Sequence, residues 1–196
     1  MKLDIILCGV GGQGILSIAT IIGDAAMAQG LYIKQAEVHG MSQRGGDVHS
    51  DLRISSTPIA SDLISKGKAD VIISLEPMEA LRYLPMLASK GWIITAAAPF
   101  VNIPNYPEMS EIDSQLAHLP QVIRIDVTAI AKEHQMPRCA NIILLGAAQD
   151  ALGMNYAQLE TSIRNVFGRK GEKVVAMNLK ALALGREYAM QHKAAK

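Results

Sequence analysis

The sequence contains few cysteines and no long apolar run. Cysteine occurs only at positions 8 and 139, in unrelated apolar contexts. A disulfide framework, a zinc site or an iron–sulfur cluster held by this chain alone is therefore not expected, since a cluster normally takes four thiolates. No apolar stretch approaches the ~20 residues that span a bilayer, and the N-terminus lacks the pattern of a secretory signal. These absences predict a cytoplasmic chain with no membrane partner, in which both cysteines are buried small apolar side chains.

An excess of charge of one sign is also missing. The net charge is +1 at pH 7, and no basic run occurs, so nucleic acid is not expected as a partner. Hydrophobic residues make up 49% of the chain and charged residues 19%, which is apolar for a free monomer. We therefore expect a surface that binds another protein. The length of 196 residues fits a single domain, residues 1–196.

A glycine-rich turn stands between a strand-like and a helix-like segment near the start of the chain. The apolar run at residues 3–8 leads into GVGGQG, and apolar residues recur on one helical face from Ile15 onward. This is the layout of a βαβ phosphate-binding turn, in which a helix N-terminus offers free N–H groups to an anion. The candidate phosphate-binding residues are Gly9, Gly11, Gly12, Gln13 and Gly14. The alternative is a tight strand-to-helix turn that binds nothing.

A second polar, glycine-rich segment occupies residues 37–51. Its hydrogen-bond donors include a candidate substrate-side or interface set, His39, Ser42, Gln43 and Arg44. Arg44 precedes two glycines, so it could hold a phosphate or carboxylate by a forked contact. The alternative is a structured turn in which Arg44 pairs with a local carboxylate such as Asp47. Glu37 follows the glycines at close to the ~20 residues expected of an NAD-binding fingerprint, but no second, substrate-binding domain accompanies it.

Strand-like runs alternate with helical segments along the rest of the chain. Strands are expected at 31–37, 48–54, 71–75, 92–95 and 122–125, and helices include 76–87, 126–134, 141–152 and a last amphipathic helix. The alternation at 48–54 favours an edge or antiparallel strand with one wet face. The prolines at 99–107 indicate an exposed or partner-bound loop. The pattern predicts an α/β, doubly wound, Rossmann-like sheet, mostly parallel, with helices on both faces.

Glu76 and the last helix carry two further sequence signals. Glu76 precedes a helix, where a carboxylate meets the positive end of the helix dipole, although contact with a partner or a nucleotide is an alternative. The inner stripe of the last helix is expected at Val174, Met177, Ala181, Leu184 and Tyr188. No residue pairs with an evident nucleophile, so no catalytic residue and no metal ligand is expected in this chain.

Four stretches together resemble a known family. They are LCGVGGQGILSIATIIGDAA, AEVHGMSQRGGDVHSDLRIS, KADVIISLEPMEALRYL and the CANIILLGAAQDALG region. They look like the beta subunit of indolepyruvate ferredoxin oxidoreductases and, more broadly, the gamma-type subunit or domain of 2-oxoacid ferredoxin oxidoreductases. The resemblance covers nearly the whole chain. HGMSQRGGDVHSDLRIS is specific, whereas GVGGQG alone is not.

The resemblance implies a subunit of a heteromeric enzyme that oxidatively decarboxylates an aryl pyruvate, with coenzyme A as co-substrate and ferredoxin as electron acceptor. Thiamine diphosphate, Mg and [4Fe–4S] clusters would belong to a large alpha subunit, and the glycine turn would hold a phosphate of coenzyme A or another nucleotide. The alternatives are the gamma subunit of a pyruvate or 2-oxoglutarate enzyme, a non-catalytic nucleotide-binding module, and a free-standing NAD-dependent dehydrogenase.

Overall fold

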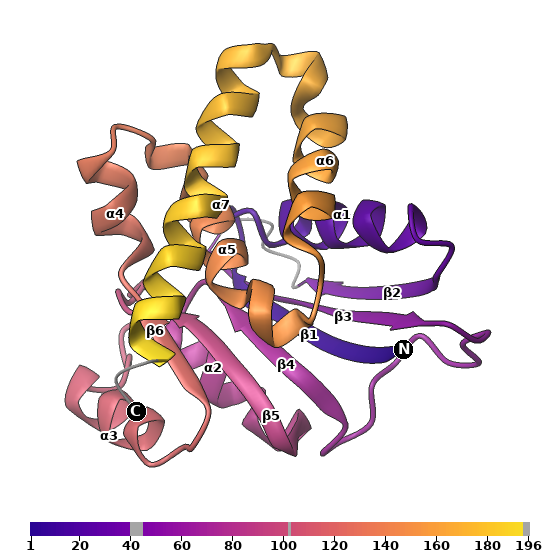
Figure 1. Ribbon diagram of the computed structural model, residues 1–196. Coiled ribbons are helices and arrows are strands. Elements are labelled where there is room, and N and C mark those ends of the chain that lie inside the picture. Colours follow the sequence, from indigo (N-terminus) through magenta and orange to yellow (C-terminus); the bar gives the residue numbers. More distant parts are fainter. Residues whose placement is uncertain (40–44, 102, 194–196) are drawn as a thin grey trace.

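A six-stranded, mostly parallel β-sheet forms the centre of the computed structural model, which describes residues 1–39, 45–101 and 103–193 (Figure 1). The strands are β1 (Lys2–Val10), β2 (Tyr32–His39), β3 (Asp47–Ser55), β4 (Ala69–Ser74), β5 (Leu87–Ala96) and β6 (Val122–Ile125). Their order is β2-β3-β1-β4-β5-β6. Strands β1, β4, β5 and β6 run parallel, whereas β3 is antiparallel to both β1 and β2. The expected doubly wound α/β fold is confirmed.

Helices cover both faces of this sheet. They are α1 (Ile15–Met27), α2 (Pro77–Arg82), η1 (Leu84–Met86), α3 (Met109–Ala117), α4 (Val127–Glu133), η2 (Pro137–Cys139), α5 (Ala140–Leu152), α6 (Tyr156–Phe167), η3 (Gly168–Lys170) and α7 (Glu172–Lys193). Side chains of β1 alternate between two cores, because successive residues of a strand point to opposite faces. Ile5 and Leu7 join the larger core with α1, α5, α6 and α7, while Ile6 and Cys8 join the smaller core beside α2 and η1.

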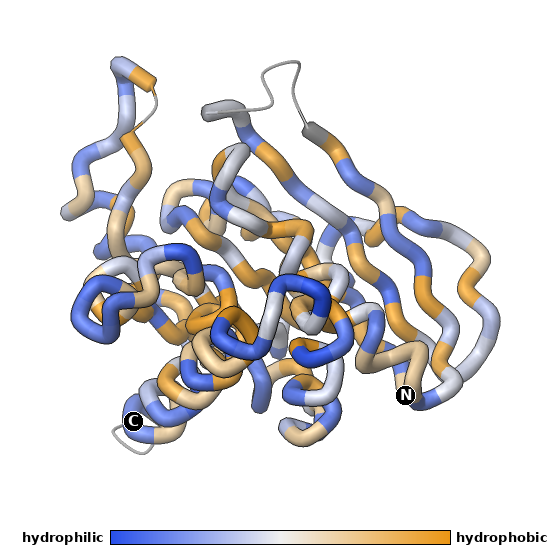
Figure 2. Tube along the Cα trace, turned by 90° about the horizontal axis from the view of Figure 1, so that it is seen from above, coloured by the Kyte–Doolittle hydropathy of each residue, from blue (hydrophilic) through white to orange (hydrophobic). Residues whose placement is uncertain are grey.

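The carboxyl ends of the parallel strands define the functional edge of the molecule. Strands β1, β4 and β5 end there, at Val10, Ser74 and Ala96. The glycine turn, the start of α2 and the loop after β5 leave from this edge, where ligand sites of open α/β sheets form. In Figure 2 the last described residues of β2, the first residues of β3 and the segment that follows β5 lie on the same side of the molecule.

The prediction that one face of β3 is exposed to solvent is wrong. The strand is antiparallel as expected, but it lies inside the sheet, and β2 forms the edge. Asp51 is only 5% exposed, because Ile64 in the following loop covers it and donates its backbone N–H to the carboxylate at 2.8 Å. The alternation of polar and apolar residues along β3 thus predicted a polar face, but it could not predict that a loop covers that face.

The predicted helix over 76–87 is too long. Helix α2 ends at Arg82, a short 3₁₀ turn follows, and β5 already begins at Leu87. Pro85 explains the early end, since proline removes a helical hydrogen bond and clashes with the preceding turn. The strand expected at 92–95 is correspondingly longer, and Gly91 lies within it against the carbonyl oxygen of Ala69.

The inner face of α7 also differs from the expected stripe. Its most deeply buried residues include Val175, Asn178, Leu182 and Ala189, one position later than most of the expected set, although the expected Ala181 is fully buried. The other expected residues are half-buried and pack on the margin of the core. Within the described residues, none of the helices is both long enough and apolar enough to cross a membrane.

Candidate functional site

The glycine turn at residues 9–14 is shaped by the side chain of Gln13. Its Oε1 accepts the backbone N–H of Val10 at 2.7 Å, and its Nε2 donates to the carbonyl of Leu75 at 3.0 Å. Gln13 therefore fastens the turn to the end of β4. Gly14 then begins α1 with a left-handed backbone (φ 90°), a conformation that glycine adopts at little cost.

Besides Gln13, two more of the five candidate glycine-turn residues, Gly9 and Gly11, are engaged in structural contacts. A Cβ at Gly9 would lie 2.7 Å from Gln13 Oε1, so a side chain there would disturb the turn. The N–H of Gly11 donates to Gly46 at 2.8 Å, and its carbonyl accepts from Gly45 at 3.4 Å. These contacts tie the turn to the β2–β3 hairpin, and the amide of Gly11 is already paired.

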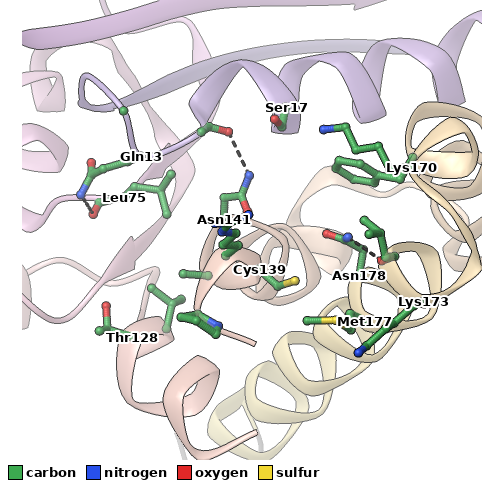
Figure 3. A pocket seen from close by; sticks show the side chains of 18 residues that line it. Gln13, Ser17, Leu75, Thr128, Cys139, Asn141, Lys170, Lys173, Met177 and Asn178 are labelled. Atoms are coloured by element: carbon green, nitrogen blue, oxygen red, sulfur yellow. Dashed lines mark hydrogen bonds between the residues drawn. The ribbon is translucent and has the colours of Figure 1, made fainter. Parts of the chain in front are cut away.

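The other three candidates, Gly12, Gln13 and Gly14, line a cavity of about 800 Å³ (Figure 3). The opposite walls come from the start of α4, from the η2–α5 junction and from the η3–α7 junction. The cavity therefore brings the glycine turn together with residues that lie more than a hundred positions later in the sequence. Its size is that of a typical ligand pocket, for which the range is about 300–1,000 Å³.

The cavity is electropositive. Arg138, Lys170 and Lys173 line it, and none of its described lining residues is a carboxylate. All three cations are exposed to solvent. Figure 3 shows Lys170 extending toward Ser17 in the first turn of α1, and its ammonium lies 5.2 Å from the centre of the Phe167 ring. A protein of net charge +1 thus gathers three cations at one opening, which favours an anionic ligand.

Two helix N-termini add to this positive potential. Neither N-cap residue, Gly14 for α1 or Cys139 for α5, supplies a side-chain cap, although the N–H of Ile142 in the first turn of α5 donates to Asn141 Oδ1 at 3.0 Å. The first N–H groups of a helix have no partner within the helix, so an anion in the cavity could accept them. Asn141 joins the two helices, because its Nδ2 donates to the carbonyl of Gly14 at 3.1 Å.

The basic residues of the cavity were missed by the sequence interpretation. The segment 168–171 reads as a helix break, yet it carries Lys170 and leads to Lys173. The sequence signal that could have indicated these residues is the cluster of basic residues in GRKGEK, which also contains two glycines. Nothing in the sequence indicated that this turn faces the glycine turn, because the contact depends on how α6 and α7 pack against α1 and α5.

The second candidate set is only partly visible. Ser42, Gln43 and Arg44 lie outside the described residues, and His39 is placed only by its backbone at the end of β2. Glu37 is exposed on β2 and accepts a hydrogen bond from Gln35 at 2.8 Å. Because β3 lies between β1 and β2, Glu37 is not on the strand next to β1, which does not match the NAD-binding arrangement.

A half-buried polar cluster, with Glu79 at its buried end, lies on the other face of the sheet edge, between the start of β3 and α2. Tyr83 Oη lies 3.1 Å from Asp47 Oδ2 and 2.7 Å from His49 Nδ1. Glu79 is 1% exposed and binds Arg82 at 2.8 Å, and the carboxylate of Asp47 lies near it. Burial and the nearby Asp47 charge raise the pKa of Glu79 to about 7, against the opposing effect of Arg82.

This raised pKa predicts a stability that falls with pH. Between about pH 4.5 and 7 the folded chain keeps a proton on Glu79 that the unfolded chain has released, so the free energy of unfolding decreases as pH rises. Each unit of pKa difference corresponds to about 1.4 kcal/mol. We expect Glu79→Gln to reduce this loss in denaturant unfolding at pH 5 and pH 8, while Glu133→Gln, at an exposed position, retains it. Equal pH dependence in wild type and Glu79→Gln would contradict the assignment.

Neither cysteine is placed for metal or redox chemistry. Cys8 and Cys139 are free and buried, and desolvation raises the pKa of both thiols. Among the residues that the structure describes, no group of three or more histidine, cysteine or carboxylate side chains could hold a metal ion. The described residues therefore do not fit an iron–sulfur cluster.

Comparisons with known proteins agree with this architecture. The family model described as pyruvate ferredoxin/flavodoxin oxidoreductase matches residues 4–188. The indolepyruvate oxidoreductase subunit IorB of Archaeoglobus fulgidus is 36% identical over 97% of this chain and 96% of its own length.

Two solved structures share the fold. One is the gamma subunit of a keto/oxoacid ferredoxin oxidoreductase from Geobacter sulfurreducens, with a TM-score of 0.69, 24% identity and coverage of 96% of this chain and 99% of that chain. The other is 2-oxoglutarate:ferredoxin oxidoreductase from Magnetococcus marinus, with 2-oxoglutarate, coenzyme A and succinyl-CoA bound, a TM-score of 0.75 and 23% identity. That match covers 97% of this chain but only 31% of the Magnetococcus chain.

Proposed function

Because this chain belongs to the pyruvate ferredoxin/flavodoxin oxidoreductase family, we propose that it is the small subunit of an indolepyruvate-type ferredoxin oxidoreductase. The whole complex would oxidatively decarboxylate an aryl 2-oxoacid, transfer the acyl group to coenzyme A and pass electrons to ferredoxin. Support comes from the 36% identity to an IorB subunit over nearly the full length of both chains. The small subunit would bind and orient coenzyme A and would carry none of the redox centres.

The electropositive cavity is the observation that supports this role most strongly. Coenzyme A carries its charge on phosphates, and the cavity offers three cations, no carboxylate among its described lining residues, and two helix N-termini. The backbone at Gly12 and Gly14, on the turn that Gln13 holds in place, would approach one phosphate, and Lys170 and Lys173 would pair with the other phosphates. Coenzyme A held in this way supplies the thiol that accepts the acyl group. This thiol would have to reach the partner subunit, where the acyl group is formed.

Thiamine diphosphate, Mg and the iron–sulfur clusters are assigned to a large partner subunit. The two buried cysteines of this chain cannot supply the four thiolates that a cluster normally takes. No described residue group has the composition of a metal site. We place the complex in the cytoplasm, where free cysteines such as Cys8 and Cys139 remain reduced.

The proposal predicts that activity requires two chains. The small subunit purified alone should give no measurable reduction of ferredoxin with indolepyruvate and coenzyme A. Co-expression with the large subunit of the same oxidoreductase should yield a complex that turns over, with a higher kcat/KM for indolepyruvate than for pyruvate or 2-oxoglutarate. Turnover by the rigorously purified small subunit would refute the division of labour, and a preference for pyruvate or 2-oxoglutarate would favour the gamma subunit of such an enzyme.

A further inference from the structure

The loop between β5 and α3, described at residues 97–101 and 103–108, is anchored by one buried carboxylate. Glu76 is 0% exposed and caps α2, as the sequence predicted, by accepting the N–H of Glu79 at 2.9 Å. The same carboxylate accepts the backbone N–H of Phe100 at 3.3 Å and the hydroxyl of Tyr106. A single side chain at the start of α2 thus holds the loop at two points six residues apart.

This anchoring gives an exposed loop a defined shape. A buried carboxylate is costly unless donors surround it, so release of the loop would remove two of the three donors that the described residues give Glu76. The positions of Phe100 and Tyr106 are therefore coupled to the N-terminus of α2. Loops held in one conformation before binding lose less entropy on association than flexible loops do.

The anchored loop presents apolar side chains to solvent. Phe100 is 45% exposed and Val101 is 68% exposed, and neither belongs to either core. Both follow β5, at the carboxyl edge of the sheet from which the glycine turn also leaves. An exposed apolar side chain next to an anchored backbone is typical of a residue that enters a pocket on a partner and carries much of the binding energy.

The partner is indicated by the length of a structural neighbour. In the Magnetococcus chain this fold accounts for 31% of the polypeptide, so the remaining part is covalently linked to it. The A. fulgidus IorB relative, which is matched over 96% of its own length, is named as a subunit of an indolepyruvate oxidoreductase. In the proposed complex a large subunit would supply the remainder and contact the fold described here across a surface.

We infer that Phe100 and Val101, held in place by Glu76 and Tyr106, insert into an apolar pocket of the large subunit and anchor the two chains together. The inference rests on the proposed function, because it takes the large subunit as the partner. Glu76 acts as a positioning residue for the docking loop. Since the loop and the glycine turn share one edge of the sheet, a partner seated on the loop lies on the side where the cavity presents its ligand.

The test measures the affinity of the small subunit for the purified large subunit. We expect Phe100→Asp and Val101→Asp each to raise the Kd by about thirtyfold or more, as for a hot-spot residue. Leu63→Asp is the matched control, because Leu63 is 62% exposed but lies before β4, near the opposite edge of the sheet. Its Kd should stay within about twofold of wild type. Because all three positions are exposed, the variants should keep the thermal unfolding midpoint of wild type.

Two further variants distinguish the direct contact made by the apolar side chains from the positioning of these side chains by Glu76 and Tyr106. Glu76→Gln and Tyr106→Phe leave the apolar tip intact but weaken its anchoring, so we expect a Kd several-fold higher than wild type, with slower association. Failure of the wild-type chain to bind the large subunit at all would refute the proposed function. Normal binding by wild type with unchanged Kd for Phe100→Asp and Val101→Asp would overturn the inference while leaving the function intact, as would loss of binding in Leu63→Asp alone.

Discussion

Gly185→Ala is expected to destabilise the protein by about 3 kcal/mol or more, because helices α5 and α7 pack with their backbones in contact. A Cβ at Gly185 would overlap the carbonyl oxygen of Ile143 and lie 2.9 Å from the amide nitrogen of Ala147. A Cβ at Gly146 would likewise overlap the carbonyl oxygen of Leu182. Backbone atoms cannot rotate away as a flexible side chain can, so the helices must separate, and the core between them must open.

The matched control is Gly23→Ala in α1. Gly23 also lies inside a helix, but a Cβ there would meet nothing within 4 Å. We expect it to be neutral or stabilising by about 0.5–1 kcal/mol, since glycine weakens a helix interior. For a chain of this size, Gly185→Ala should lower the thermal midpoint by roughly 6–12 °C. A midpoint for Gly185→Ala within a degree or two of wild type would show that α5 and α7 are less closely packed than the structure indicates.

This close approach also explains why the face of α7 could not be predicted from hydropathy. The helix buries Gly185 and Asn178, two residues that a hydrophobic pattern treats as breaks. The expected stripe instead followed the larger apolar side chains, which sit at the margin of the core. A helix that packs backbone to backbone places its small residues at the centre of the contact and its large residues beside it.

Local signals in the sequence were more reliable than those that depend on distant contacts. The side chains of Asp126 and Asn155, residue types that favour the N-cap position, cap α4 and α6 by accepting the N–H groups of Ala129 and Ala157. The buried residues of α1 include every member of the expected face, such as Ile15 and Ile22. These features are determined within one helical turn, so the sequence is sufficient to predict them.

The candidate site could be predicted only in part, for the same physical reason. The motif indicated a glycine turn at the end of β1, and the structure shows Gly12 to Gly14 at a cavity. It did not indicate that the backbone N–H of Gly11 donates to the carbonyl of Gly46 in the β2–β3 hairpin, since that hydrogen bond joins residues 35 positions apart. Nor did it indicate Lys170 and Lys173, whose place at the cavity depends on the packing of two later helices.

Reversing the charge of the cavity should have the largest effect on coenzyme A use. We expect Lys170→Glu/Lys173→Glu in the assembled complex to raise the KM for coenzyme A by at least about tenfold, because two attractive charges become repulsive ones. The kcat at saturating coenzyme A and the KM for the 2-oxoacid should change little, since neither lysine is proposed to touch the reacting atoms. Both values come from steady-state rates of ferredoxin reduction measured on the purified complex.

A control with the same change in net charge separates local from global electrostatics. Lys66→Glu/Lys68→Glu alters two exposed lysines just before β4, near the edge of the sheet opposite to the cavity. Its KM for coenzyme A should stay near wild type, because charges more than about 10 Å away are screened at 0.1 M salt. The difference between the two double variants should also shrink as ionic strength rises. If both raised the KM equally, the effect would come from net charge; if neither did, the cavity would not be where this chain holds the phosphates of coenzyme A.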